Sequence, residues 1–219
     1  MKIFLDTANV PKIKEWAKTG VIDGVTTNPS HLAKEGGDPT KMVKEICNIL
    51  KDGEISVEVT KDEPKEVLEQ ARAIADLGPN ILVKVPCHKK YYEIINQLVQ
   101  DNIKLNITLV FTPLQALMMA KLGVTYVSPF VGRWDDIDAP GIDILEEIKH
   151  VMELYDFDTQ VLAASIRSVR NFHDAVLIGC DAVTLPVDVF EKSIDHPLTD
   201  RGIEKFNADW KKLDITKFP

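Results

Sequence analysis

Short apolar runs rich in β-branched residues alternate with longer amphipathic stretches along the whole chain. The short runs have the length and composition of buried strands, whereas the longer stretches repeat apolar residues at helical spacing. The predicted strands span residues 2–6, 24–27, 55–59, 81–85, 104–109, 126–130, 160–165 and 182–185. The predicted helices span residues 10–18, 39–50, 64–77, 90–100, 113–122, 141–155, 168–178 and 187–193.

This alternation predicts an α/β protein, a (β/α)₈ TIM barrel, because the strand and helix runs form eight consecutive pairs. The competing fold is an open, doubly wound sheet. That fold shows a glycine-rich first turn when it holds a dinucleotide, and neither GxGxxG nor GxxxxGK[ST] occurs here. No linker or charge block interrupts the series, so we expect residues 1–195 to form one catalytic barrel domain.

Residues 196–219 are predicted to form a helical extension beyond the barrel. Ile203, Phe206, Trp210 and Leu213 make an apolar stripe at helical spacing. Such a helix can pack on its own domain. This one follows a completed barrel and could also contact a neighbouring subunit.

Composition narrows the function classes. The net charge of −8 argues against a nucleic-acid partner, and no apolar stretch approaches the ~18 residues of a membrane span. The three cysteines are scattered and the five histidines are isolated, which is typical of reduced thiols and gives no metal-ligand spacing. The chain opens directly into a strand without a signal-peptide pattern. We therefore expect a cytoplasmic protein with no metal site.

One lysine stands inside a strand-like apolar run. Lys84 lies within Ile-Leu-Val-Lys-Val-Pro at residues 81–86. Burial disfavours the charged form of a lysine, and a neutral amine is what an imine-forming nucleophile needs. The alternative is a lysine that reaches from the strand end into solvent.

Nearly all of the remaining predicted strands also carry a polar residue, either on the strand or just after it. The ends of barrel strands meet at one mouth. A shared site explains these residues better than separate buried polar groups, each of which would be costly. They are Asp6, Asn28, Glu58, Asn106, Thr108, Ser128 and Ser165, with Arg133 and Arg167 just beyond two strands. Each also has a structural alternative: Asp6 and Asn28 as helix caps, Thr108 as a strand former, and the arginines in surface ion pairs.

Together these residues suit imine chemistry on a sugar phosphate. Lys84 would attack a ketone, Glu58 with Thr108 would relay the protons, and Asp6 would be the base for carbon–carbon cleavage. Sugar hydroxyls would be oriented by the amide and hydroxyl groups of Asn28, Asn106 and Ser128. A terminal phosphate would meet the two guanidiniums and a hydroxyl, from Arg133, Arg167 and Ser165.

Six ordered motifs resemble the transaldolase family, in particular its small subfamily, which includes fructose-6-phosphate aldolases. They are FLDTA from residue 4, GVTTNP from 24, VKVP from 83, NIT from 106, SPFVGR from 128 and ASIR from 164. The resemblance covers essentially the whole chain. It implies the same roles for the residues above, no metal or organic cofactor, and a ring-based homo-oligomer, a pentamer or decamer.

Two positions separate the activities within that family. Transaldolases carry glutamate and phenylalanine where the aldolases carry glutamine and tyrosine, and this chain has Glu58 and Phe130. The resemblance thus implies transfer of a dihydroxyacetone unit in the pentose phosphate pathway. The donor would be sedoheptulose 7-phosphate or fructose 6-phosphate, and the acceptor erythrose 4-phosphate or glyceraldehyde 3-phosphate. The alternatives are aldolase-type release of dihydroxyacetone and a non-catalytic sugar-phosphate-binding barrel.

Overall fold

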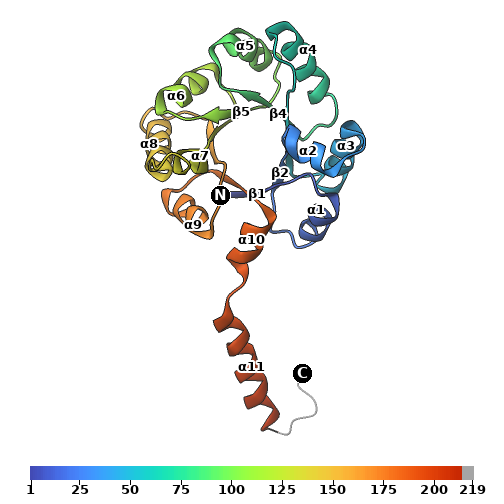
Figure 1. The fold of residues 1–219 in the computed structure, drawn as a ribbon, viewed down its shortest axis with the longest axis vertical. Helices are drawn as coiled ribbons and strands as arrows, with labels where there is room; N and C mark the ends of the chain where they lie inside the picture. The colour runs from blue at the N-terminus through green and yellow to red at the C-terminus, as the bar shows by residue number, and fades with distance from the viewer. Residues whose placement is uncertain (214–219) are drawn as a thin grey trace.

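Eight parallel strands pair in sequence order and close on themselves, with β8 beside β1 (Figure 1). The computed structural model describes residues 1–213. The strands are β1 (Lys2–Asp6), β2 (Gly24–Thr26), β3 (Glu54–Glu58), β4 (Ile81–Pro86), β5 (Leu105–Val110), β6 (Tyr126–Pro129), β7 (Gln160–Ala163) and β8 (Ala182–Leu185). The predicted barrel is therefore confirmed and the open sheet excluded, with strand ends shifted by one or two residues.

The predicted helices surround this ring of strands (Figure 1). They are α1 (Val10–Ala17), α3 (Pro39–Ile49), α4 (Pro64–Ala75), α5 (Tyr92–Gln100), α6 (Pro113–Leu122), α8 (Gly141–Leu154), α9 (Val169–Ile178) and α10 (Val187–Ile194). Two short helices were not predicted, α2 (Pro29–Glu35) and α7 (Val131–Asp135), and the predicted helix 90–100 begins as a separate 3₁₀ turn, η1 (Lys89–Tyr91). Segments this short show too little periodicity to be read from a sequence.

The core has two layers. Most buried apolar residues fill the space between the strands and the outer helices. A smaller cluster fills the barrel interior with Phe4, Leu82, Tyr126, Leu162, Ala164 and Ala182. Gly24 makes room for this cluster, because a Cβ atom there would lie 2.3 Å from the Glu54 carbonyl oxygen and 3.0 Å from the Phe4 ring. The barrel is thus a packed core rather than a pore.

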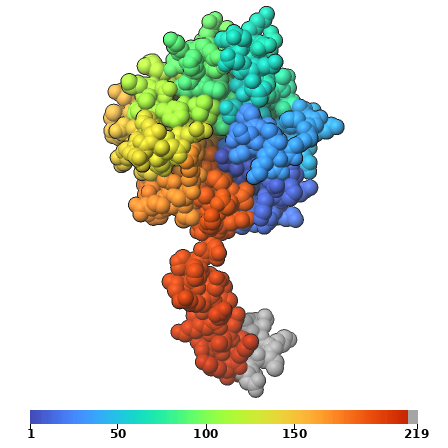
Figure 2. Space-filling model, in the orientation of Figure 1, coloured from blue at the N-terminus to red at the C-terminus, as the bar shows by residue number. Residues whose placement is uncertain are grey.

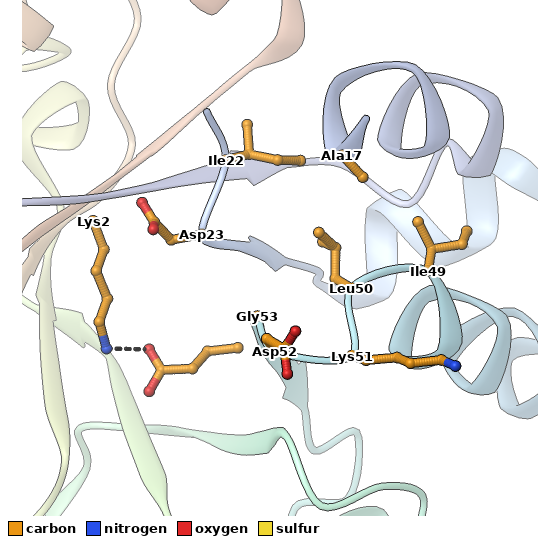
Figure 3. Close-up of a pocket in the computed structure, with 10 residues that line it drawn as sticks. Lys2, Ala17, Ile22, Asp23, Ile49, Leu50, Lys51, Asp52 and Gly53 are labelled. Atoms are coloured by element: carbon orange, nitrogen blue, oxygen red, sulfur yellow. Dashed lines mark hydrogen bonds and ion pairs between the residues drawn. The ribbon is translucent and has the colours of Figure 1, made fainter. Parts of the chain in front are cut away.

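A polar network closes the amino-terminal end of the barrel. Lys2 donates to Glu54 at 2.8 Å and to the Tyr126 hydroxyl at 2.9 Å, and that hydroxyl also donates to Glu54 at 2.8 Å. Burial, followed by the Glu54 carboxylate, raises the pKa of Tyr126. Figure 3 shows Lys2 and Asp23 beside a pocket of about 380 Å³. Its other walls come from the segments that lead into β2 and β3, including Ile22 and residues 49–54. This end of the barrel is therefore held together by a structural network.

A final helix, α11 (Pro197–Lys211), extends away from the barrel (Figures 1 and 2). It confirms the predicted extension within the described residues. Its side chains Leu198, Ile203 and Phe206 are exposed. Across residues 1–213, no helix is both long enough and apolar enough to cross a membrane.

Candidate active site

Along several strands, the inward-facing side chains change from apolar in the barrel interior to polar at the mouth. Side chains two residues apart on a strand share a face. Each inward apolar residue is therefore followed, two residues later, by another residue that points inward. The successive pairs are Phe4 and Asp6, Leu82 and Lys84, Tyr126 and Ser128, and Ala182 and Thr184. The second residue of each pair is nearer the carboxyl end of its strand, which is the end where barrel enzymes place their chemistry.

These side chains border one cavity of about 200 Å³ at that end. Every predicted site residue lines it except Glu58 and Thr108. The lining residues are Asp6, Thr26, Asn28, Lys84, Asn106, Ser128, Phe130, Arg133, Ala164, Ser165, Arg167 and Thr184. Residues from seven of the strands or their following loops therefore meet in one place, as the shared-site hypothesis predicted.

Lys84 is enclosed and has a carboxylate partner. It occupies the same register as Glu58 on the neighbouring strand, and its Nζ lies 3.1 Å from Glu58 Oε2. The side chains are only 8% and 16% exposed. The alternative in which Lys84 reaches into solvent is therefore wrong. Glu58 does not line the cavity itself, but it contacts Lys84, which does.

A hydrogen-bonded chain fixes two further polar residues. Ser128 donates to Asn106 Oδ1 at 2.6 Å, and Asn106 Nδ2 donates to Ser56 Oγ at 3.0 Å. All three are buried. Asn106 also pairs in register with Lys84 on β4. The amide is thereby held in one orientation next to the lysine.

Asp6 is held from one side by hydroxyl groups. Thr26 donates to Asp6 Oδ1 at 2.7 Å, and Thr26 and Thr184 lie 2.6 Å apart at their hydroxyl oxygens. Asp6 does not cap the following helix, because Asn9 accepts the amide of Lys12 there. Its carboxylate is therefore available to the cavity. Thr26 and Thr184 were not predicted, although both stand at inward positions of their strands.

Thr108 lies at an irregularity in β5. The pairing with β6 shifts between Ile107 and Val110, and Leu109 has a φ of 57°. The Thr108 hydroxyl is buried and makes no hydrogen bond with residues 1–213. A buried hydroxyl left unpaired costs about 1–3 kcal/mol, so this group is suited to bind a water.

Two arginines stand at the outer rim of the cavity. Arg133 on α7 is exposed and has no ion pair within the described chain, whereas Arg167 forms a two-pronged ion pair with Asp136. That pairing lowers the pKa of Asp136. A side chain at Gly132 would lie 2.4 Å from the Ser165 carbonyl oxygen and 2.6 Å from Arg167 Nε, so glycine allows the two loops to meet. Ser165 itself has a φ of 57°.

Asn28 and Phe130 complete the predicted set. Asn28 Oδ1 accepts the amide of His31 at 2.9 Å and so caps α2, as its structural alternative proposed. Asn28 also lines the cavity, so the residue combines both roles. Phe130 packs edge-on against Phe111, with ring centroids 6.0 Å apart. Among residues 1–213, no group of three or more His, Cys, Asp or Glu side chains could hold a metal ion.

Comparison with known proteins gives this barrel its family. The family described as transaldolase/fructose-6-phosphate aldolase matches residues 3–216. The chain belongs to this family. A "probable transaldolase" of Thermodesulfovibrio yellowstonii is 48% identical over 97% of this chain and 99% of its own. Proteins with the same name from Methanococcus maripaludis and Thermoplasma volcanium are 46% and 48% identical, over 96% and 97% of this chain and 98% and 96% of theirs.

Family membership and these relatives make the chain a transaldolase-type enzyme. A solved structure of a mandelate oxidase variant matches with a TM-score of 0.60 at 15% identity, over 84% of this chain and 63% of that one. At that identity the likeness concerns the barrel fold alone.

Proposed function

We propose that this enzyme transfers a dihydroxyacetone unit from a ketose phosphate to an aldose phosphate through an imine on Lys84. The donor would be sedoheptulose 7-phosphate or fructose 6-phosphate, and the acceptor erythrose 4-phosphate or glyceraldehyde 3-phosphate, as in the pentose phosphate pathway. The observation that carries the proposal is the enclosed Lys84–Glu58 ion pair, because its lysine lines the same cavity as Asp6.

Imine formation begins at the ion pair. Lys84 passes a proton to Glu58, and the free amine adds to the substrate ketone to give a carbinolamine. Loss of the hydroxyl as water requires a proton, which Glu58 returns with help from the Thr108 hydroxyl. Glu58 lies 3.1 Å from the amine, close enough for the first transfer. The unpaired hydroxyl of Thr108 suits a water in this relay.

Cleavage then uses Asp6. Its carboxylate removes the proton of the hydroxyl on the far carbon of the bond that breaks, that carbon becomes the aldehyde carbon, and the electrons of the bond move into the iminium. An aldose phosphate leaves as the aldehyde, and an enamine remains on Lys84. In the second half, the enamine carbon attacks the acceptor aldehyde and protonated Asp6 returns its proton to the new alkoxide. Water hydrolyses the imine and releases the new ketose phosphate.

The remaining cavity residues bind the sugar. Asn106 and Ser128 are already oriented toward each other by a hydrogen bond, and with Asn28 they suit the hydroxyls of the dihydroxyacetone unit. Arg133, Arg167 and Ser165 at the rim suit the phosphate, with guanidiniums binding its oxygens in forked geometry. Phe130 offers no proton to the enamine, which favours transfer over release.

The test is product analysis of fructose 6-phosphate with and without erythrose 4-phosphate, combined with borohydride trapping. We expect sedoheptulose 7-phosphate only when the acceptor is present, and a reduced adduct at Lys84. Rapid release of dihydroxyacetone without the acceptor would favour the aldolase alternative. Binding without any trapped adduct would favour the non-catalytic barrel.

We also propose that residues 196–219 are a separate extension of the barrel domain that docks onto a second copy of this chain, in a pentamer or decamer. The support is the exposed apolar stripe of α11, where Ile203 and Phe206 are 53% and 72% exposed. Every copy carries both the stripe and a barrel, so a homo-oligomer covers all stripes at once. Phe206→Asp should lower the mass measured by light scattering. Asn207→Asp adds the same charge one position away and should not.

We place the enzyme in the cytoplasm, acting on small sugar phosphates without a nucleic-acid or membrane partner. The acidic balance of the chain and its three buried free cysteines support this placement.

A further inference from the structure

His31 stands behind Asp6, on the side away from the catalytic cavity. Its Nδ1 lies 3.7 Å from Asp6 Oδ1. That nitrogen is buried and makes no hydrogen bond with residues 1–213, although the side chain as a whole is 28% exposed. The ring therefore turns one polar edge inward, toward the carboxylate. A buried polar atom without a partner is costly, and it indicates a bond that forms at another stage of the cycle.

Asp6 lines two cavities. The catalytic cavity lies on one side, and a second cavity of about 250 Å³ lies on the other. The second cavity is lined by Asp6, Thr7, Ala8, His31, Lys34, Glu35, Pro186, Val187 and Asp188. Asp6 and His31 thus lie side by side along this second cavity, with the imidazole beside the carboxylate.

We propose that His31 is a positioning residue for Asp6: its Nδ1–H donates to Asp6 Oδ1 while Asp6 accepts the substrate hydroxyl proton. The gap of 3.7 Å is about 0.5–1 Å longer than a hydrogen bond, which a small rotation of the ring closes. Thr26 already donates to the same oxygen at 2.7 Å. Two donors on Oδ1 leave Oδ2 as the oxygen that faces the substrate.

The local backbone supports this placement. α2 begins directly after β2, and Asn28 fixes its first turn by accepting the His31 amide at 2.9 Å. A residue proposed to contact substrate and the residue proposed to steady the base are therefore joined by one hydrogen bond.

The inference rests on the proposed role of Asp6 and makes a prediction specific to one step. Asp6 serves in cleavage and formation of the carbon–carbon bond, whereas Lys84 and Glu58 form the imine. Loss of the His31 donor should therefore slow transfer without slowing imine formation. A side chain that merely supported the fold would affect both steps.

Three variants of His31 test its N–H donor separately from the rest of the imidazole ring. His31→Leu removes both nitrogens, His31→Asn keeps an N–H near the Nδ1 position, and His31→Gln places it near Nε2. For His31→Leu we expect kcat of transfer from fructose 6-phosphate to erythrose 4-phosphate to fall about tenfold, the effect of a slightly misplaced catalytic group. KM and the rate of borohydride trapping with dihydroxyacetone should stay unchanged. His31→Asn should recover most of kcat and His31→Gln should not.

Each outcome decides one question. Unchanged kcat in His31→Leu overturns the role of His31, and so does equal recovery by His31→Asn and His31→Gln. A parallel fall in trapping also overturns it, because the residue would then support the site as a whole. Absence of a trapped adduct in the wild-type enzyme would instead overturn the proposed function. If His31→Leu does not fold, the contrast between the two amide variants makes the same decision.

Discussion

Lys84 and Glu58 stand at the same register of adjacent parallel strands, with Nζ and Oε2 3.1 Å apart inside the barrel mouth. Parallel register places their side chains next to each other on the inner face. The lysine is therefore not an isolated buried amine, since its proton has an acceptor within reach. Transfer of the proton from Lys84 to Glu58 leaves a neutral carboxylic acid and a nucleophilic amine, so this one pair supplies both the nucleophile and its proton acceptor.

Lys84→Met should abolish imine trapping while the barrel still folds. Methionine matches the length and apolar stem of lysine but has no amine. Glu58 would lose its ion-pair partner, but its side chain is 16% exposed and can be hydrated instead. The measurement is the mass of the enzyme after borohydride treatment with dihydroxyacetone, with circular dichroism as the control for folding. An adduct that persists and maps to Lys89 or Lys90 would contradict the assignment.

Arg133→Ala and Arg167→Ala should weaken binding of phosphorylated substrates selectively. A charge-assisted hydrogen bond contributes about 1.5–3 kcal/mol, so KM for fructose 6-phosphate should rise roughly tenfold or more. KM for unphosphorylated dihydroxyacetone as a donor should stay the same. Arg170 provides a matched control, because it is exposed and paired with Asp174 on its own helix. A loss shared by both substrates would place the two arginines outside the phosphate site.

Asp136→Asn should lower KM for sugar phosphates. Both terminal nitrogens of Arg167 are occupied by the Asp136 carboxylate, so a phosphate must displace it. The guanidinium holds the pKa of Asp136 below its usual value, and competition therefore persists throughout the range above the ordinary carboxyl pKa. It is lost only as the pH falls through that lowered value. If Asp136 instead orients Arg167 for the phosphate, KM will rise, and this can be read directly from saturation curves.

Cys87 should resist alkylation although it follows the lysine strand. Burial raises the pKa of its thiol to about 11, compared with an ordinary value of 9.0. The reactive thiolate is therefore roughly a hundredfold scarcer at neutral pH than in an ordinary cysteine. Iodoacetamide at about pH 8 should leave activity intact and label Cys87 only after denaturation. The unfolded thiol ionises at lower pH than the folded one, so this residue favours unfolding once the pH exceeds the ordinary value.

The sequence predicted the site residues whose location depends only on their position along a strand. Lys84, Asn106 and Ser128 lie on strands that are visible in the chain as short apolar runs, and parallel pairing brings such residues to one mouth. The predicted roles of these residues follow from side-chain chemistry together with family resemblance.

The sequence could not predict contacts that depend on loops and side-chain direction. Nothing in the chain pairs Asp136 with Arg167, which are 31 residues apart, because α7 is too short to be read from periodicity. His31 was set aside as an isolated histidine, and only the fold places its Nδ1 near Asp6. Thr184 could have been found, since it stands two residues beyond the inward Ala182.

Phe130 and Glu58 should together hold the enzyme in transfer mode. The enamine on Lys84 is lost to release only when a group protonates its carbon and water then hydrolyses the imine. Phe130 lines the cavity and packs against Phe111. Its ring has no hydroxyl to supply a proton and gives this wall an apolar surface. A tyrosine hydroxyl at this position can donate or position a proton. Phe130→Tyr should therefore raise the release of dihydroxyacetone from fructose 6-phosphate.

Glu58→Gln should reinforce that change for a separate reason. Glutamine cannot accept the lysine proton, so it removes the ion pair at 3.1 Å and alters the relay that forms and hydrolyses the imine. The quantity to measure is the ratio of dihydroxyacetone release to transfer onto erythrose 4-phosphate, in the wild type, each single variant and the double variant. Phe111→Tyr adds a hydroxyl to the neighbouring ring and serves as the control. We expect the ratio to rise from wild type to Phe130→Tyr and again in the double variant. A wild-type enzyme that releases dihydroxyacetone as fast as it transfers it would identify an aldolase, because Phe130 would then provide no barrier to protonation.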